Sequence, residues 1–193
     1  MDNLVLQIPG LDSLDVGTLI FARGFKQYCE MVKKIQAGEC FFCQLNTDFN
    51  EVIFENKLWH GWYYTAQIES ANLACHIVIA HKRHLPQLTE LTSEDGRYLF
   101  EIVLMFAKKD NLSGGGLLMR FGDPRLNAGT VRHLHLNIIV PNGKGDVRLP
   151  LRKTGDEVEQ NMKKALVFEK MRLGTPLNEL EPTEYELVKD RMK

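Results

Sequence analysis

The chain of 193 residues lacks most features that mark a specialised class of protein. No apolar run is long enough to span a membrane. The start, Met1-Asp2-Asn3, has neither the basic residues nor the apolar block of a secretory signal. The formal net charge of -1 gives no support for general attraction to nucleic acid or to membranes. We therefore expect a cytoplasmic protein that has neither as a partner.

Cysteine is scarce, and several common motifs are missing. The four cysteines of a cytoplasmic chain are thiols or metal ligands more often than disulfides. No internal repeat, low-complexity linker or Gly-rich turn of the Walker or Rossmann kind occurs. Hydrophobic content of 44% and charged content of 25% are ordinary for a globular protein, and this length can bury one good core.

The hydrophobic pattern predicts short strands in the middle of the chain and helices elsewhere. Strands are expected at about 51–56, 58–66, 71–80, 117–122 and 131–140. A helix is expected at 16–37, and a second from the N-terminal cap at Thr92–Asp95 through Lys109. Two capping boxes predict two later helices: Thr154 and Glu157 begin one that ends near Gly174, and Thr183 and Glu186 begin a short one at the C-terminus. This order favours an antiparallel α+β sandwich. We divide it into an N-terminal helical segment (1–38), a sheet-bearing part (39–150) and a C-terminal helical extension (151–193), together forming one compact domain.

The predicted strand at 131–140 carries the strongest chemical signal. Polar and apolar residues alternate strictly for six residues from His133 to Ile138, which is the period of a half-buried strand. On such a strand His133, His135 and Asn137 project from one face, and the leucines and isoleucine between and after them project from the other. Two imidazoles and an amide on one face need hydrogen-bonding partners, a metal or a ligand.

Cys40-Phe-Phe-Cys43 is the second candidate element. A C-x-x-C pair brings two thiolates within reach of one ion, but by itself it fits both redox and metal roles. A thioredoxin-type pair needs a helix that opens at the motif, whereas here the predicted helix stops at Gly38. Zinc is attractive if histidines such as His84 complete a tetrahedral set. The alternative is two partly buried thiols with no metal.

Two further elements lie near these motifs. The turn before His133 has Thr130, whose hydroxyl and neighbouring backbone N–H groups suit phosphate oxygens. The same turn is also ordinary for an Asn- and Gly-containing loop. His76 begins an apolar run, so it can simply be a core histidine whose hydrogen bonds are satisfied. The aromatic stretch Trp59 to Tyr64 can stack on a nucleobase or can be core strand.

These residues resemble the histidine triad family. His133-Leu-His135-Leu-Asn137 is similar to its His-x-His-x-His signature, with Asn in place of the last histidine. The segment from His76 to His84, followed by Leu-Thr-Glu-Leu-Thr, resembles the family's "GHxLVIPKRHxxxLxELT" block, and 128–131 resembles its pre-triad loop. The likeness covers about 39–141. It implies an α+β fold with a five-stranded antiparallel sheet and packed helices, a homodimer, and nucleotide binding.

The resemblance also implies roles for the residues of the triad region. His135, the middle position, would be the nucleophile that forms a nucleotidyl-histidine intermediate. Thr130 and Gly129 would contact the phosphate, and His76 would support the polar network. Asn137 can donate a hydrogen bond to a phosphate oxygen but cannot protonate a leaving oxygen at neutral pH. Its presence therefore favours good leaving groups, or reduced activity.

A metal site is implied by a related branch. Galactose-1-phosphate uridylyltransferases also carry an amide, Gln, at the last triad position. They bind a metal through a C-x-x-C pair, a downstream histidine and the first triad histidine. Carried over, Cys40, Cys43, His84 and His133 would form a closed, structural Cys₂His₂ zinc site.

Other parts of the family pattern are absent. We find no match for an acidic residue that holds the ribose, and Gly122 stands where members often have Asn. We expect a nucleotide phosphoanhydride hydrolase or nucleotidyltransferase that acts on a dinucleoside polyphosphate or a similar substrate. The first alternative is a catalytically weak nucleotide-binding or regulatory module. The second is a zinc-stabilised protein that binds partners through its C-terminal helices.

Overall fold

The computed structural model of the chain describes residues 6–43, 51–65, 72–127, 129–149, 151 and 155–192. The chain divides into two compact units, and each is described by itself. The sheet unit comprises Cys40–Gly122 and His133–Leu149. The helical unit comprises Met1–Glu39, Asp123–Arg132 and Pro150–Lys193. The helical unit thus includes a segment from the middle of the chain, which no pattern in the sequence indicates. The domain boundaries at 38 and 150 stay a prediction.

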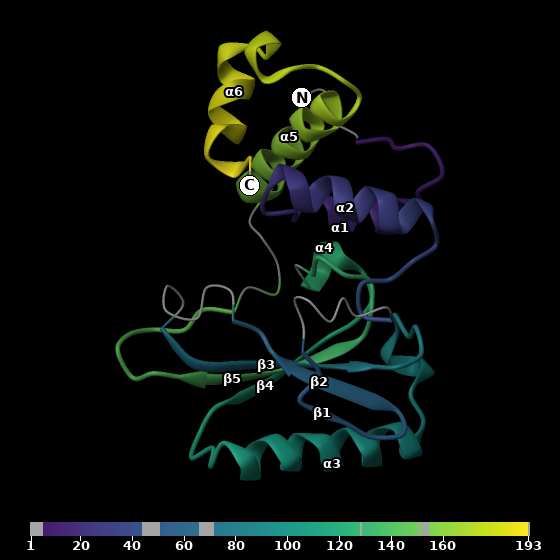
Figure 1. Cartoon of the computed structure of the whole chain (residues 1–193), viewed down its shortest axis with the longest axis vertical. Helices are drawn as coiled ribbons and strands as arrows, with labels where there is room; N and C mark the ends of the chain where they lie inside the picture. Colours follow the sequence, from purple (N-terminus) through teal and green to yellow (C-terminus); the bar gives the residue numbers. More distant parts are fainter. Residues whose placement is uncertain are drawn as a thin grey trace. The chain divides into compact units, whose positions relative to one another are not determined.

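The sheet unit contains one antiparallel sheet of five strands (Figure 1). Its strands are β1 (Phe54–Glu55), β2 (Trp59–Tyr63), β3 (Leu73–His81), β4 (Gly116–Arg120) and β5 (His135–Pro141). Their order across the sheet is β1-β2-β3-β5-β4, so the strand that carries the histidines is flanked by neighbours on both sides. The expected α+β fold with a five-stranded antiparallel sheet is confirmed.

Helix α3 (Ser93–Lys109) covers one face of this sheet (Figure 1). It begins at the predicted cap, because Thr92 Oγ1 accepts a hydrogen bond from the Asp95 N–H and the Asp95 carboxylate accepts one from the Thr92 N–H. Its buried face is the predicted one and consists of Leu99, Ile102, Val103 and Phe106. Burial of each such side chain contributes about 1.5–3 kcal/mol, which holds the helix on the sheet.

The strands alternate between the two faces of the sheet, as a period of two requires. In β2, Trp59 packs into the core under α3, whereas Trp62 belongs to a small cluster on the opposite face. Gly61 lies directly beneath the helix: a Cβ added there would be 2.5 Å from Phe106 Cε2. The close approach of helix and sheet at this point therefore requires glycine.

The helical unit contains α1 (Ser13–Leu19), α2 (Phe25–Gln36), α4 (Pro124–Asn127), α5 (Gly155–Arg172) and α6 (Pro182–Val188). The single helix expected at 16–37 is wrong, because the chain forms two helices separated by a break. Gly24 is extended there and caps the start of α2. No helix in the described part of the chain is long and apolar enough to cross a membrane.

Two capping boxes were predicted near the C-terminus. The first begins at Thr154, which lies outside the described residues. The second, predicted at Thr183 and Glu186, is wrong, because the capping box of α6 is formed by Glu181 and Glu184. Pro182 explains the difference: it has no N–H and a fixed φ, which suit the first position of a helix.

Candidate active site and cysteine–histidine cluster

The face of the sheet that points away from α3 carries the polar residues of β5. His135 and Asn137 are both buried on it, and Leu136 and Ile138 are buried in the core under α3. The alternation predicted from the sequence is thus confirmed. The strand begins at His135 instead of 131, because the Leu134 N–H donates to the Leu85 carbonyl and the residues before it form bends.

His135 is held in one orientation by the backbone. Its Nδ1 lies 2.7 Å from the carbonyl oxygen of His133, so Nδ1 carries the proton and donates it to that oxygen. This assignment leaves Nε2 as the nitrogen with a lone pair. Burial lowers the pKa of His135 to about 4, so the ring is neutral at pH 7. A neutral, oriented imidazole can act as a nucleophile without first losing a proton.

Asn137 is paired with His76 on the neighbouring strand β3. Its Oδ1 lies 2.9 Å from His76 Nε2, which fits donation from a protonated Nε2, and its Nδ2 donates to the Leu118 carbonyl at 3.2 Å. His76 is half-buried and belongs to the polar face. His76 thus lies outside the core under α3 and its Nε2 has a partner, whereas its supporting role in the site stays a prediction; the amide of Asn137 is fixed by partners on both sides.

Aromatic side chains cover part of this face. The Phe42 ring packs edge-on against Trp62, His133 and His135, with ring centroids 5.0–5.7 Å apart. Trp59, in contrast, is fully buried under α3 and donates its Nε1–H to the Asp95 carbonyl. The aromatic residues of β2 thus divide between the two faces of the sheet, Trp59 in the core under α3 and Trp62 on the face of His135; the stacking role stays a prediction. We did not predict Phe42 from the sequence, although its place between two candidate ligands could have indicated it.

Cys40, Cys43, His84 and His133 form one cluster in the sheet unit, as the resemblance implied. Their four candidate ligand atoms all lie within 4.8 Å of one another. His133 Nδ1 is 3.3 Å from Cys40 Sγ and 3.5 Å from Cys43 Sγ, and His84 Nδ1 is 3.6 Å from Cys43 Sγ. Tetrahedral zinc with its usual bond lengths separates sulfur and nitrogen ligands by about 3.5 Å. The residues present therefore fit a zinc ion.

The surroundings of the cluster also suit a metal. His133 Nε2 lies 2.8 Å from the His81 carbonyl oxygen, so the proton sits on Nε2 and the Nδ1 lone pair faces the cysteines. The cysteines ionise unequally. Burial opposes ionisation of Cys40, but the neighbouring His133 and His84 side chains outweigh burial and lower the pKa of Cys40. Burial and the neighbouring Cys40 thiolate raise the pKa of Cys43. A cation would favour the thiolate at both positions.

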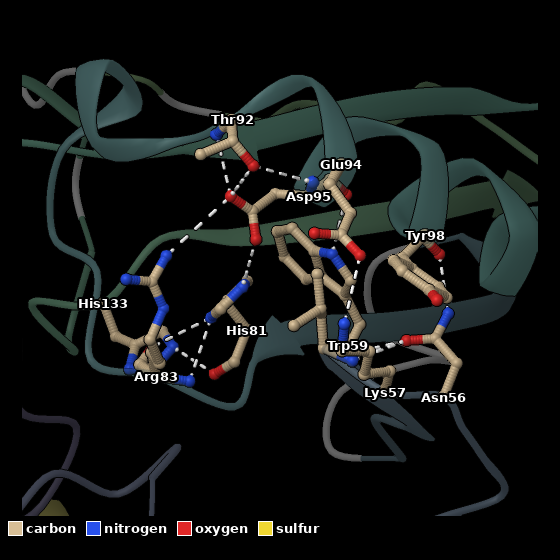
Figure 2. A network of polar contacts seen from close by, with 11 residues as sticks. Asn56, Lys57, Trp59, His81, Arg83, Thr92, Glu94, Asp95, Tyr98 and His133 are labelled. Atoms are coloured by element: carbon tan, nitrogen blue, oxygen red, sulfur yellow. Dashed lines mark hydrogen bonds and ion pairs between the residues drawn. The ribbon is translucent and has the colours of Figure 1, made fainter.

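A buried network connects this cluster to the start of α3 (Figure 2). His81 Nε2 donates to Asp95 Oδ1 at 2.8 Å, and both side chains are almost fully buried. Burial alone would raise the pKa of Asp95, but hydrogen bonds from Thr92 and His81 hold it below its ordinary value. The contact of His81 with Asp95 could not be predicted from the sequence, because nothing in the spacing of a strand end and a helix cap indicates it.

The predicted phosphate loop belongs to the helical unit. Gly129 N–H donates to Asn127 Oδ1 at 2.7 Å, and Thr130 is half-buried. The structure therefore groups Gly129 and Thr130 with the helices and groups His135, Asn137 and His76 together in the sheet unit. The phosphate role of the two loop residues stays a prediction.

His60 is a second residue of this face that no motif in the sequence indicates. It lies on the same face as His135, and burial lowers its pKa to about 4. Its Nε2 is buried and has no hydrogen-bond partner within the described residues. His60 is therefore a neutral, buried imidazole beside Trp62.

Several solved structures are similar to this chain. The histidine triad nucleotide-binding protein from Candida albicans is 17% identical; the match covers 70% of this chain and 99% of that one, with a TM-score of 0.47. A HIT family protein from Bacillus anthracis is 20% identical, with 71% and 97% covered and a TM-score of 0.46. The Plasmodium falciparum diadenosine triphosphate hydrolase is 19% identical, with 63% and 75% covered and a TM-score of 0.39. No family model and no curated protein matches the chain.

Proposed function

We propose that the protein is a nucleotide phosphoanhydride hydrolase or nucleotidyltransferase that works through a nucleotidyl-His135 intermediate. The proposed substrate is a dinucleoside polyphosphate or a similar nucleotide. One observation carries the proposal: His135 is a neutral, buried imidazole whose Nδ1–H is fixed on the His133 carbonyl at 2.7 Å. The resemblance of the surrounding sequence to the histidine triad family supports the same assignment.

The first chemical step follows from this orientation. The Nε2 lone pair of His135 attacks a phosphorus atom and forms a P–N bond, while the P–O bond to the leaving phosphate breaks and that oxygen keeps the electron pair. The Nδ1 proton stays in place, so the ring of the intermediate is cationic. The His133 carbonyl accepts that N–H and stabilises the charge. Water or another acceptor then attacks the phosphorus and releases His135.

Asn137 limits which leaving groups can depart. Its Oδ1 accepts from His76 and its Nδ2 donates to Leu118, so it can offer one remaining N–H to a phosphate oxygen. It has no proton to transfer to a leaving oxygen at neutral pH. A phosphate that departs as a stable anion needs no such proton, whereas an amine or a simple alkoxide does. The substrate class is therefore a phosphoanhydride.

The half-buried Phe42 ring provides a surface for the nucleoside. Phe42 contacts His135, and the buried Trp62 packs against Phe42 with the ring centroids 5.2 Å apart. Stacking of a base on an aromatic ring contributes about 1–3 kcal/mol and depends little on which base it is. We propose that the base stacks on Phe42 while its phosphates reach His135.

The decisive experiment is detection of the covalent intermediate. Wild-type protein and His135→Ala protein are mixed with a dinucleoside polyphosphate or a nucleoside phosphoramidate, and the intact protein mass and the released products are measured. We expect turnover and a transient mass increase of one nucleotidyl group with the polyphosphate, in the wild type only. Absence of both, or equal turnover in His135→Ala, would refute the enzymatic proposal.

The alternative function is a nucleotide-binding or regulatory module. The observation that favours it is Asn137 itself, since both ends of its amide are already engaged by protein groups. Nucleotide binding by calorimetry without adduct or turnover would select this alternative.

We further propose that Cys40, Cys43, His84 and His133 hold a structural zinc ion. When bound, zinc would fix the four side chains and favour both thiolates. Metal analysis of the purified protein tests this: we expect about one equivalent of zinc, which Cys40→Ser loses and Cys75→Ser keeps. Cys75 is a matched control, because it is a half-buried thiol on β3 outside the cluster. Unchanged metal content in Cys40→Ser would refute this ligand set.

We also propose that two copies of the chain associate through α3 and β4. β4 is an edge strand, so it has unpaired backbone groups that a second strand can bind. Phe100 and Leu104 on α3, and Leu117 on β4, are each more than half exposed. Light scattering after size exclusion tests this: Leu104→Asp should yield a monomer, whereas Leu173→Asp, at an exposed leucine of the helical unit, should not.

A further inference from the structure

One row of side chains crosses the sheet beside the proposed nucleophile. His60 on β2 pairs with Ala80 on β3, Ala80 pairs with His135 on β5, and His135 pairs with Arg120 on β4. Directly paired residues of an antiparallel sheet point to the same face, with Cβ atoms about 4.5–5.5 Å apart. The Arg120 side chain therefore starts next to the His135 ring, on its face of the sheet.

The two sides of His135 along this row differ. On the side of β3 and β2, the Phe42 ring packs against His135 and belongs to the cluster around Trp62 and Ala80. A phosphate group cannot occupy the space that the Phe42 ring fills. The other side of His135 along the row faces β4, where Arg120 ends the strand. A phosphate that reaches Nε2 from that side passes Arg120.

The chemistry of the face around Arg120 suits an anion. The residues that β2, β3, β4 and β5 place on this face include imidazoles, an amide and apolar side chains: His60, Trp62, His76, Val78, Ala80, Leu118, Asn137 and Ile139. Glu55 on β1 pairs with His60 and adds a carboxylate, but it lies at the opposite edge of the sheet from Arg120 and forms an ion pair with Lys82 at 2.8 Å. Arg120 is half-buried, so its charge is less screened by water than that of a surface arginine. Burial lowers the pKa of Arg120, but an arginine remains charged at neutral pH.

We propose that Arg120 is a further phosphate-binding residue of the His135 site, where it supplies the positive charge that a third histidine would otherwise supply. This inference rests on the proposed function and makes it more specific. A guanidinium donates two parallel N–H groups to the oxygens of one phosphate or of two adjacent phosphates. Together Arg120 and Asn137 then replace the third histidine of the family signature. Arg120 provides a positive charge, and Asn137 provides a neutral hydrogen-bond donor.

The guanidinium takes part in the reaction without changing its own protonation. When His135 Nε2 forms the bond to phosphorus, the electron pair of the broken P–O bond goes to the departing phosphate. Arg120 holds oxygens of the reacting phosphate group and keeps all its protons, because its pKa is far above that of any phosphate. Such a site binds a substrate with two or more linked phosphates better than a nucleoside phosphoramidate.

The test measures binding of inorganic pyrophosphate by calorimetry, because this probe has no base. We expect Arg120→Gln to weaken its binding about 10- to 100-fold, as loss of hydrogen bonds to a charged group does. Arg120→Lys should keep part of the affinity through its charge. Arg97→Gln is the matched control: Arg97 lies on α3, is exposed and forms an ion pair with Glu101. It should bind pyrophosphate as the wild type does.

The outcomes separate this inference from the proposed function. Equal pyrophosphate affinity in wild type and Arg120→Gln, or no binding by the wild type, overturns the role of Arg120 even if the His135 adduct forms. Weaker binding in Arg120→Gln supports that role even if no adduct forms, in which case the enzymatic proposal alone fails. An unchanged urea midpoint of Arg120→Gln shows that lost affinity is not lost folding. A weaker salt dependence of pyrophosphate binding in Arg120→Gln supports a direct contact.

Discussion

Replacement of Asp95 by Asn should destabilise the sheet unit strongly. The buried carboxylate accepts three short hydrogen bonds, from the Thr92 N–H at 2.7 Å, the Thr92 hydroxyl at 2.7 Å and His81 Nε2 at 2.8 Å (Figure 2). Asparagine has the same shape, but one of its two ends is an NH₂ group. Whichever way it turns, that group faces a donor, either the Thr92 N–H or the protonated His81 Nε2.

The expected cost follows from these contacts. Asp95→Asn removes the charge from a buried pair and leaves at least one buried donor without a partner, which costs about 3 kcal/mol or more in free energy of unfolding. For a chain of this length such a loss lowers the melting temperature by about 6–12 °C. The substitution also releases His81, whose carbonyl accepts from the cluster residue His133.

Tryptophan fluorescence during urea unfolding is the appropriate assay. The two tryptophans of the sequence, Trp59 and Trp62, both lie in the sheet unit, so the signal reports that unit. Glu94→Gln is the control, because Glu94 pairs with Lys57 at 3.1 Å on the exposed surface and should change stability by less than about 1 kcal/mol. Zinc concentration must be the same for all variants, since a bound metal adds stability. Equal midpoints for Asp95→Asn and Glu94→Gln would refute the reasoning.

Three further predictions concern packing, acid stability and the metal. Gly61→Ala should cost about 1–3 kcal/mol, because its Cβ would lie 2.5 Å from Phe106; a wild-type urea midpoint would contradict this. A hydrogen bond from Arg172 holds the pKa of Glu169 below its ordinary value, so this pair stabilises the fold above about pH 4.5 and loses that contribution as the pH falls through the lowered pKa. Circular dichroism should therefore show less acid-induced loss of stability in Glu169→Gln than in wild type, and parallel pH profiles would disprove the assignment. Removal of zinc with a chelator should slow adduct formation on His135 while α3 stays helical by circular dichroism. An unchanged rate would exclude an effect of the metal site on the orientation of His135.

The part of the fold that could be predicted from the sequence is the part with regular local signals. The capping residues of α3 and its buried face are encoded within one helix, and the alternation along β5 is encoded within one strand. The two-helix start of the chain was missed because a run of apolar residues at helical spacing continues across Gly24. Inclusion of the segment Asp123–Arg132 in the helical unit depends on contacts distant in sequence, for which no local pattern exists.

The candidate site shows the same limit. The four cluster residues could be identified because a family pattern gives their joint spacing, and their ligand atoms do come together. Arg120 and His60 had no such pattern. They reach the face of His135 only through strand register, which is set by pairing between strands and not by the strands' own sequences. Sequence motifs therefore identified the residues that resemble a family, and the structure was needed for those particular to this chain.

His133 explains why the cluster and the proposed nucleophile would act together. Its Nδ1 faces the two cysteines, and its carbonyl oxygen accepts the Nδ1–H of His135. A metal that fixes His133 therefore also fixes the tautomer of His135 and the direction of its Nε2. The groups proposed to contact the phosphate, Asn137 and Arg120, then have no proton to give at neutral pH. A site that orients its nucleophile so firmly, and whose two proposed phosphate contacts cannot give a proton, favours a leaving group that departs as an anion, which is the property of a phosphoanhydride.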